Sequence, residues 1–445
     1  MSSGFSYSRD KFCDLAQDVL DHAKSHGATA CEVDISEGFG QSVSVRLQEV
    51  ETLEYNRDKG LGVTVYIGQR RGSASSSDFS KHAMRATVEA ALSIARFTAK
   101  DDCAGLPDRK LLAKKRMELD LFHPWDISIE GAIDIARRCE QAAFDVSPLV
   151  KNSEGASVSA QQSHFVSANN LGFMDGFSTS RHYVSCSVIA GTGDDMQRDD
   201  WYVSQRDAAN FPDPATVGDY AARRALSRLH SRKLSTRKCP VIFEAPLAVG
   251  LIGSLVHAVS GGALYRKTSF LLDSLGTKLF PDFVQISELP HIPGAFSSSP
   301  FDDDGVATKD RELIKDGVLQ GYFLSTYSAR KLGMKTTANA GGAHNLRVQS
   351  GALDLDGLLK KMGTGLLVTE LMGQGVNYVT GDYSRGAAGY WVEGGEIAYP
   401  VEEITIAGNL RSMFQGIISI GNDVEKRGSK HVGSILLDQM TIAGN

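Results

Sequence analysis

Several signatures of well-defined protein classes are missing from this 445-residue sequence. Its first residues are polar and lack the apolar segment of a secretory signal. The six cysteines are scattered, none belongs to a C-x-x-C pair, and none follows Cys239. Scattered thiols without a signal are typical of the reducing cytosol, so we expect a cytoplasmic protein.

Nucleotide-binding and hydrolase motifs are also missing. No Gly-Lys dipeptide is present, which excludes a Walker-type phosphate loop, and no G-x-G-x-x-G follows a strand and opens a helix. There is no G-x-S-x-G elbow for a serine hydrolase. No histidine precedes a glutamate, so an H-E-x-x-H zinc helix is excluded.

The charge balance excludes two further classes. The formal net charge is -6, which argues against direct binding of nucleic acid and gives no reason to expect attraction to anionic lipid. Residues 245–264 carry no formal charge, but they include a proline, a histidine and four glycines between basic flanks. A buried helix that begins near Pro246 fits this segment better than a membrane span.

The spacing of apolar residues predicts a mixed fold. Periods of three and four residues predict helices, and alternation with glycine-rich turns predicts antiparallel sheet. We therefore predict an α+β protein of two domains, with residues 1–235 as helices on an antiparallel sheet and residues 236–445 as a strand-rich domain around a buried helix. The predicted helices cover residues 8–26, 79–98, 128–144, 216–232, 246–260 and 354–362; the predicted strands include 31–35, 42–47, 52–55, 61–67 and the alternating region 155–188.

Three side-chain patterns have ordinary structural explanations. His22 and His26 have the i, i+4 spacing that can hold a metal, but we expect a frayed helix end without a third ligand. The run of three aspartates at residues 302–304, followed by Gly305, favours a turn over a calcium loop. The aromatic residues near 390 and Tyr399 are more typical of a sheet core than of a recognition surface.

Segments of the second half resemble one known family. Residues 251–266, 269–276 and 301–306 are similar to the central part of the PmbA proteins, also called TldE. The most specific similarity lies in residues 389–397, Gly-Tyr-Trp-Val-Glu-Gly-Gly-Glu-Ile, and 403–410, Glu-Ile-Thr-Ile-Ala-Gly-Asn-Leu. The length of the chain and the helix near residues 79–101 also agree, so the resemblance covers nearly the whole chain.

The resemblance implies a subunit of a TldD/TldE-type metallopeptidase, a cytosolic heteromer of two homologous chains. In that family the TldD chain holds zinc through an H-E-x-x-x-H helix and a later cysteine. Matching that motif to this sequence places Val256 and Gly261 at the two histidines and His257 at the glutamate. Valine and glycine offer no metal-binding atom, so we expect no metal or other cofactor in this chain and zinc in its partner.

The resemblance further implies unfolded peptides and peptide-antibiotic precursors as substrates. Our candidates for contacts with the peptide are the polar residues of a glycine-rich stretch, Asn339, His344, Asn345 and Arg347, although all four also suit turns and caps. We expect His257 to be either a hydrogen-bonded histidine of a buried helix or a residue of the peptide cleft. The expected partners are a TldD-type subunit and a peptide, without nucleic acid or membrane, and the isolated chain could form a homodimer.

Two alternatives remain open from the sequence. The first is a regulator that binds a peptide or protein without proteolysis, as an older family label, modulator of DNA gyrase, suggests. The second is a self-sufficient metallopeptidase with other ligands, such as His291, His344 and His431, which lie on separate predicted turns.

Overall fold

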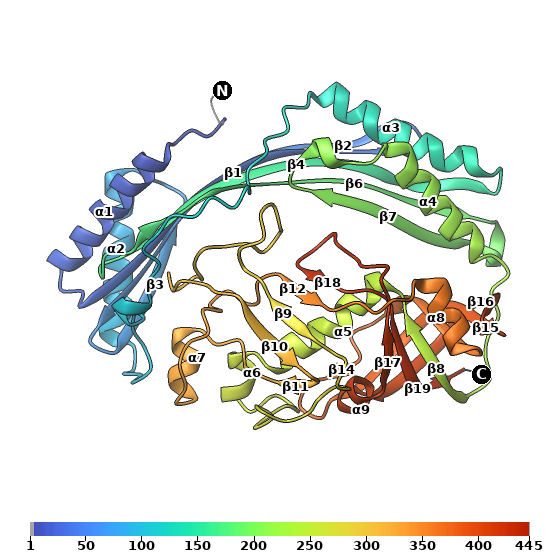
Figure 1. Cartoon of the computed structure of the whole chain (residues 1–445). Coiled ribbons are helices and arrows are strands. Elements are labelled where there is room, and N and C mark those ends of the chain that lie inside the picture. The colour runs from blue at the N-terminus through green and yellow to red at the C-terminus, as the bar shows by residue number, and fades with distance from the viewer. Residues whose placement is uncertain (1–3, 445) are drawn as a thin grey trace.

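The computed structural model describes residues 4–444. Its N-terminal part is a long, curved antiparallel sheet with helices on its outer face (Figure 1). The strand order is β3-β2-β1-β4-β6-β7, and β5 pairs with β4. The strands are β1 (Ala30–Arg46), β2 (Glu49–Ile67), β3 (Arg70–Ser76), β4 (Val150–Asn169), β5 (Met174–Asp175), β6 (Ser178–Ala190) and β7 (Gln197–Gln205).

Strands β1 and β2 are much longer than predicted. We expected turns at the glycines and aspartate of residues 38–60, but the two strands pair continuously from Ala30 to Arg46. The hairpin lies instead at Leu47 and Gln48, both with positive φ. Gly40 is a strand glycine because a side chain there would lie 2.4 Å from the Ala160 carbonyl of β4. Gly40 therefore allows close approach of two strands rather than chain reversal.

Four helices cover the outer face of this sheet, as predicted: α1 (Arg9–Ser25), α2 (Lys81–Phe97), α3 (Ile129–Val146) and α4 (Pro214–Ser227). They form two separate cores, one under α1 and α2 and the other under α3 and α4. The side chain of Ser80 caps α2, and Asp78 accepts the Ser80 N–H. Gly218 allows α4 to approach the Cys139 carbonyl of α3 closely.

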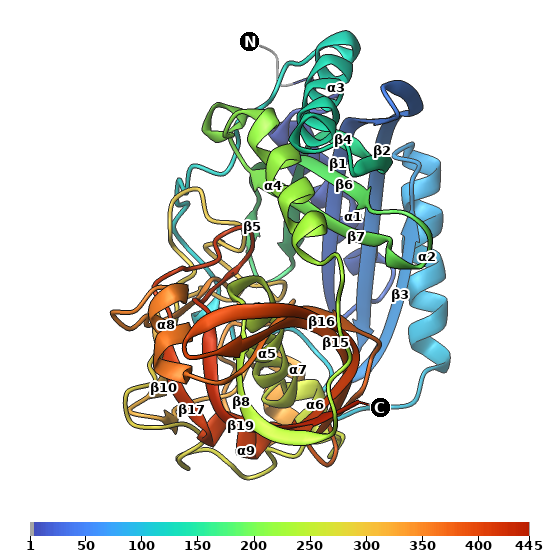
Figure 2. The same cartoon turned by 90° about the vertical axis from the view of Figure 1, so that its right-hand side faces the viewer.

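The C-terminal part contains a closed ring of strands. In the order β13-β8-β19-β16-β15 each strand pairs with the next, and β15 pairs back with β13. Helix α5 (Ala245–Ala258) packs its apolar face against this ring. Figure 2 shows α5 beside the curved strands β15 and β16. The strands are β8 (Arg237–Phe243), β13 (Gly365–Met372), β15 (Asp382–Glu393), β16 (Glu396–Asn409) and β19 (Ile435–Ala443), with β14 (Val376–Asn377) and β17 (Ile417–Ile420) attached.

A second, smaller sheet, in the order β11-β10-β9-β12-β18, lies below the long sheet and beside the ring (Figure 1). Its strands are short because turns and loops with buried polar side chains separate them. The strands are β9 (Ile286–Glu288), β10 (Arg311–Lys315), β11 (Val318–Leu319), β12 (Leu346–Val348) and β18 (Lys430–His431). The remaining helices are α6 (Gly261–Tyr265), α7 (Thr326–Lys331), α8 (Leu355–Met362), α9 (Leu410–Gln415) and the 3₁₀ turns Arg109–Leu111, Gly193–Asp195 and Ala208–Asn210.

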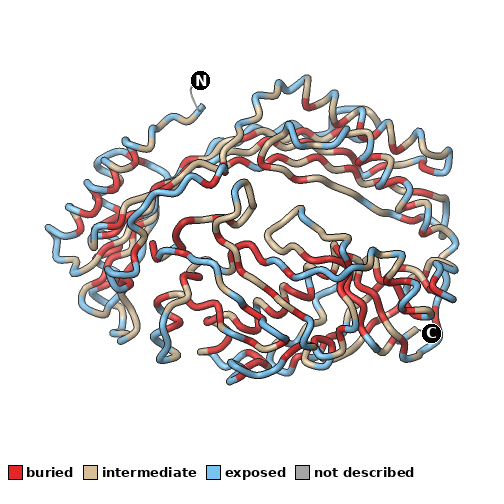
Figure 3. The backbone as a smooth tube through the Cα atoms, viewed as in Figure 1, coloured by how far each residue is buried: buried red, intermediate tan, exposed pale blue. Residues whose placement is uncertain are grey.

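These elements confirm the predicted α+β class, because helices and antiparallel strands occur in blocks. Among residues 4–444, no helix is long and apolar enough to cross a membrane. Buried residues gather under the outer helices and inside the C-terminal part (Figure 3). Polar clamps connect the parts. Among them, Arg224 of α4 binds Glu244 at one end, and Lys331 of α7 binds Asp101 at the other.

Candidate functional site

The three residues that the sequence assigned to the degenerate zinc motif do not form a metal site. Val256 is half-buried against the main core, and Gly261 begins the short helix α6. A Cβ atom on Gly261 would lie 2.2 Å from the Ser328 hydroxyl oxygen. The backbone here therefore has no room for a histidine, and the residues present do not fit zinc.

His257 is exposed, so the first of its two expected roles, a hydrogen-bonded histidine of a buried helix, is wrong. The second, a residue of the peptide cleft, stays a prediction. Its ring lies 4.0 Å from the ring of Tyr378, on the face of α5 that also carries Gly250. Leu251 and Leu255 lie on the opposite face of α5, which packs into the core. The small and polar residues at positions 250, 253 and 257 repeat at helical spacing, and this repeat is the sequence signal for the exposed face.

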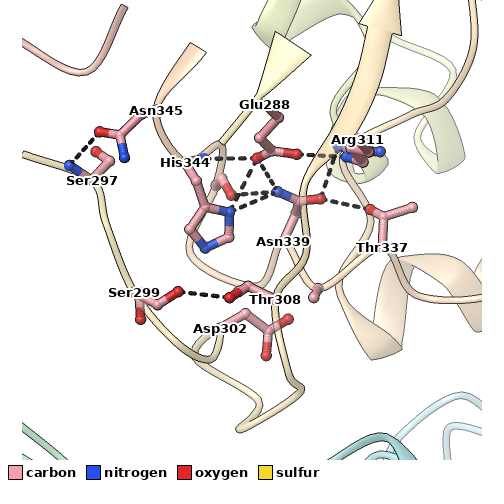
Figure 4. A network of polar contacts seen from close by, with 12 residues as sticks. Glu288, Ser297, Ser299, Asp302, Thr308, Arg311, Thr337, Asn339, His344 and Asn345 are labelled. Atoms are coloured by element: carbon pink, nitrogen blue, oxygen red, sulfur yellow. Dashed lines mark hydrogen bonds and ion pairs between the residues drawn. The ribbon is translucent and has the colours of Figure 1, made fainter. Parts of the chain in front are cut away.

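Two of the predicted cleft residues belong to a buried polar network around Glu288 (Figure 4). The Asn339 amide donates to Glu288 Oε1 over 2.7 Å, and the His344 backbone N–H donates to the same oxygen over 2.8 Å. His344 Nδ1 also lies 3.1 Å from this oxygen. Arg311 Nε donates to the other carboxylate oxygen over 2.5 Å, and Arg311 Nη2 donates to the Asn339 side-chain oxygen over 3.0 Å.

The network favours an ionised Glu288 in spite of its 1% exposure. Burial alone would raise the pKa of Glu288, but the bonds from His344 and the charge of Arg311 outweigh burial and lower the pKa. Neither Glu288 nor Arg311 is among the residues predicted from the sequence. No local pattern marks them, because they meet across the pairing of β9 with β10, 23 residues apart.

Asn345 is also occupied by the protein. Its side-chain oxygen accepts the Ser297 N–H over 2.9 Å, and its amide donates to the Leu289 carbonyl and the Ser298 hydroxyl. This arrangement holds the turn at residues 295–299 beside the long sheet. Of the four predicted residues, His344 lines one cavity and Arg347 lines another.

A cavity of about 680 Å³ lies between the inner face of the long sheet and the C-terminal part. Phenylalanine rings, the three carboxylates of Asp34, Asp302 and Asp303, and two guanidinium groups line it. Partial burial, together with the negative charges of Asp34 and Asp304, raises the pKa of Asp303. The lining residues that bear on its chemistry are Asp34, Phe165, Phe177, Arg181, Arg206, Phe296, Asp303 and His344.

The aspartates at residues 302–304 form a turn on the wall of this cavity, as predicted. Asp302 Oδ1 accepts the N–H groups of Asp304 and Val306, and Asp302 Oδ2 accepts the Ala340 N–H. Burial, followed by the charge of Asp304, raises the pKa of Asp302 to about 7. Backbone donors therefore occupy the carboxylate that a calcium ion would need.

Arg347 lines a separate cavity of about 430 Å³ with Gln285, Ser287, Lys426 and His431.

The proposed ligand set of His291, His344 and His431 does not converge on one point. His291 binds the Thr308 hydroxyl, and His344 binds Glu288. Within residues 4–444 the one group of three side chains with metal-binding spacing is His22, His26 and Glu89. The expectation that His22 and His26 lack a third ligand is therefore wrong.

Comparisons with known proteins identify the family. The PmbA/TldA metallopeptidase domain 1, central domain and C-terminal domain match residues 31–95, 122–229 and 236–444. Metalloprotease PmbA of Escherichia coli O157:H7 is 51% identical over 425 residues, covering 96% of this chain and 94% of that protein. A PmbA homolog of Haemophilus influenzae is 48% identical over 428 residues, covering 96% of this chain and 95% of that protein.

A crystal structure from Bacteroides thetaiotaomicron, of a protein proposed to modulate DNA gyrase, superposes with a TM-score of 0.93 at 26% identity. The superposition covers 97% of this chain and 99% of the Bacteroides chain. The chain therefore belongs to the PmbA/TldD family of metallopeptidases. The family resemblance of the second half, and of the chain as a whole, is confirmed.

Proposed function

We propose that this chain is the zinc-free subunit of a cytoplasmic TldD/TldE-type metallopeptidase. In this proposal it holds an unfolded peptide or a peptide-antibiotic precursor, while a homologous TldD-type chain supplies the zinc. The observation that carries the proposal is the lack of space for a side chain at Gly261, together with the lack of a metal-binding atom at Val256. Hydrolysis needs a polarised water and a base, which these residues do not supply.

The cavity between the long sheet and the C-terminal part, here called the interdomain cavity, is the proposed binding site for the peptide. Phe165, Phe177 and Phe296 offer rings for apolar side chains, and such rings carry much of the binding energy in protein interfaces. Asp303 and Arg181 supply opposite charges for the polar groups of an extended chain. Arg206 holds the cavity wall in place, because its guanidinium donates to the carbonyls of Ala295 and Phe296.

Peptide cleavage tests the assignment of roles. An unfolded peptide is incubated with this chain, with a TldD-type chain, and with both, and cleavage is followed by mass spectrometry. We expect chelator-sensitive cleavage with both chains and none with this chain alone. Chelator-sensitive cleavage by this chain alone would overturn the proposal, and full-rate cleavage by the partner alone would make this chain a bystander.

Substitutions in the cavity test the proposed peptide site. Phe296→Ala removes a cavity ring, and we expect KM of the two-chain enzyme to rise about tenfold for the loss of about 1.4 kcal/mol of aromatic contact. Phe97→Ala is the matched control, because Phe97 is 88% exposed on α2 of the outer face. Arg347→Ala tests in the same way whether the second cavity, which Arg347 lines, binds the peptide. An unchanged KM for Phe296→Ala would exclude the interdomain cavity as the peptide site.

A non-proteolytic regulator remains the alternative function. The same cavity would then bind a peptide or protein segment without a catalytic partner. Fluorescence anisotropy of a labelled peptide with this chain alone, lost in Phe296→Ala, together with no cleavage under any combination of chains, would favour this function over the first.

A further inference from the structure

The end of α1 and the middle of α2 bring together three metal-ligating side chains, His22, His26 and Glu89. Their ligand atoms all lie within 4.8 Å of one another. We propose that these residues bind a divalent transition metal of the Zn²⁺ type at a site on the outer face of the protein. The site is separate from the zinc motif of the family and from the interdomain cavity, so it does not depend on the proposed peptidase role.

The two histidines have the spacing that a helix needs for chelation. Residues i and i+4 lie on the same helix face, one turn apart. The rings of His22 and His26 have their centroids 4.0 Å apart, with an interplanar angle of 46°. Glu89 approaches from α2, and its Oε1 lies 3.6 Å from His22 Nε2. Two imidazoles and one carboxylate form a ligand set that Zn²⁺ accepts, with a fourth position left for water.

Among the described residues, each of the two rings has a nitrogen atom that takes part in no hydrogen bond. His26 Nδ1 donates to the His22 carbonyl over 2.8 Å, which leaves Nε2 of that ring as the unprotonated nitrogen. A backbone carbonyl is a common partner for the second ring nitrogen of a metal-ligating histidine. His22 Nε2 is buried, and among the described residues it has no hydrogen-bond partner. A metal ion would satisfy this atom.

The end of α1 is fixed, in contrast to the frayed end that we expected. The Ala28 N–H returns to the Ala23 carbonyl over 3.0 Å, and the Gly27 N–H returns to the Lys24 carbonyl over 3.2 Å. Gly27 has a φ of +96°, which is the conformation of a glycine cap after a helix. His26 is thus held in position before any ion binds, which lowers the entropic cost of binding.

The surroundings have mixed charge. A groove of about 360 Å³ between α1 and α2 is lined by Asp18, Asp21 and His22, and also by Lys81 and Arg85. The two aspartates favour a cation and the two basic residues oppose one. Affinity therefore has to come from direct ligation, and an ion bound there would tie α1 to α2. Ligation by the native state alone also raises the free energy of unfolding in proportion to the logarithm of metal concentration.

The test uses the full chain after treatment with a chelator. Isothermal titration with Zn²⁺ at neutral pH should show one saturable ion per chain, and Co²⁺ should give visible absorption bands. His26→Gln and Glu89→Gln each remove one ligand, and each should weaken Zn²⁺ binding at least about tenfold. Both side chains are exposed or half-exposed, so neither change threatens the fold, and circular dichroism checks this.

His82→Gln is the matched control, because His82 is an exposed histidine of the same helix α2. It should bind Zn²⁺ like the unaltered chain. In thermal unfolding, Zn²⁺ should raise the midpoint of the unaltered chain and of His82→Gln but not of the two ligand variants. The proposal is overturned if the unaltered chain shows no saturable Zn²⁺ binding, or if His82→Gln lowers the affinity as much as His26→Gln does.

Discussion

Arg224 of α4 and Glu244, the residue before α5, form a two-pronged ion pair between the two parts of the molecule. Arg224 Nη1 lies 2.9 Å from Glu244 Oε1, and Nη2 lies 3.2 Å from Oε2. Both side chains are largely buried, with exposures of 14% and 12%. The pair fixes the start of α5 against the helices of the long sheet, and the interdomain cavity lies between this clamp and the one at Asp101 and Lys331.

Breaking this pair from one side should be costly. Arg224→Ala leaves Glu244 buried without its partner, and we expect a loss of about 3 kcal/mol in the free energy of unfolding. The neighbouring Arg223 pairs with Asp219 on the surface, so Arg223→Ala is the control and should unfold like the unaltered chain. Urea titration measures both. A double-mutant cycle with Glu244→Gln isolates the pair, and equal losses for Arg224→Ala and Arg223→Ala would contradict this prediction.

Gly261 should tolerate no side chain, in contrast to the adjacent Gly262. Gly261→Ala places a Cβ atom 2.2 Å from the Ser328 hydroxyl oxygen and 3.0 Å from Leu324, so we expect a loss of about 1–3 kcal/mol from overpacking. At Gly262 the nearest atom is the flexible end of Arg266 at 3.1 Å, which can move aside. Thermal unfolding compares the two variants.

A second substitution separates overpacking from other effects of alanine. Ser328→Gly removes the atoms that a Gly261 side chain would meet first, so combining it with Gly261→Ala should cost less than the sum of the single changes. If Gly261→Ala is as stable as Gly262→Ala, the site is less tightly packed than described. A zinc ligand at residue 261 would then no longer be excluded on steric grounds.

The sequence predicted the helices well because their apolar residues repeat at helical spacing. Phe12, Leu15 and Val19 mark the buried face of α1, and the polar residues around them mark its exposed face. The long strands were broken into short ones because Gly38 and Gly40 were interpreted as turns. The role of Gly40 depends on β4, a strand more than 100 residues away, and local sequence does not encode that proximity.

The site was predictable only where a single segment determines it. The turn at Asp302 follows from its own sequence, and the structure confirms it. The partners of Glu288 come from β10 and from the loop after α7, and no local spacing marks them. The third ligand-type side chain beside His22 likewise comes from another helix. The exposure of His257 was missed because the uncharged run around it suggested burial on all sides.

The cysteines should react in two classes. Burial raises the pKa of Cys31 to about 12, with a smaller contribution from Glu32, and burial raises that of Cys239 to about 11. The thiolate is the reactive form, so these buried thiols should resist iodoacetamide at neutral pH. Cys13 and Cys103 are only partly buried and should be labelled in the native protein.

Mass spectrometry of labelled peptides identifies each site. We expect Cys103 to react before Cys13, because burial raises the pKa of Cys13. All six thiols should react in denaturant, and Cys103→Ser should remove the fast phase. Rapid labelling of Cys31 in the native protein would show that the core under α1 and α2 opens more readily than its packing indicates.

Glu288 should make the protein sensitive to acid. The pKa of Glu288 is lowered in the folded protein, whereas in the unfolded chain it is about 4.3. The folded state therefore releases this proton more readily, and the carboxylate contributes stability at pH values above the unfolded pKa. That contribution is lost as the pH falls below about 4.3 and through the lowered folded pKa. Urea titrations from pH 6 down to pH 3 measure the loss.

Two variants show whether Glu288 is the source of this loss. Glu288→Gln should lower stability at neutral pH by about 3 kcal/mol, because Arg311 stays buried without its partner. Its stability should then fall less steeply with acid than that of the unaltered chain. His344→Gln removes one hydrogen bond that lowers the pKa of Glu288 and should give an intermediate slope. Glu312→Gln is the control on the same strand β10, and it should keep the full slope. Identical acid slopes for Glu288→Gln and Glu312→Gln would assign the acid sensitivity to other carboxylates.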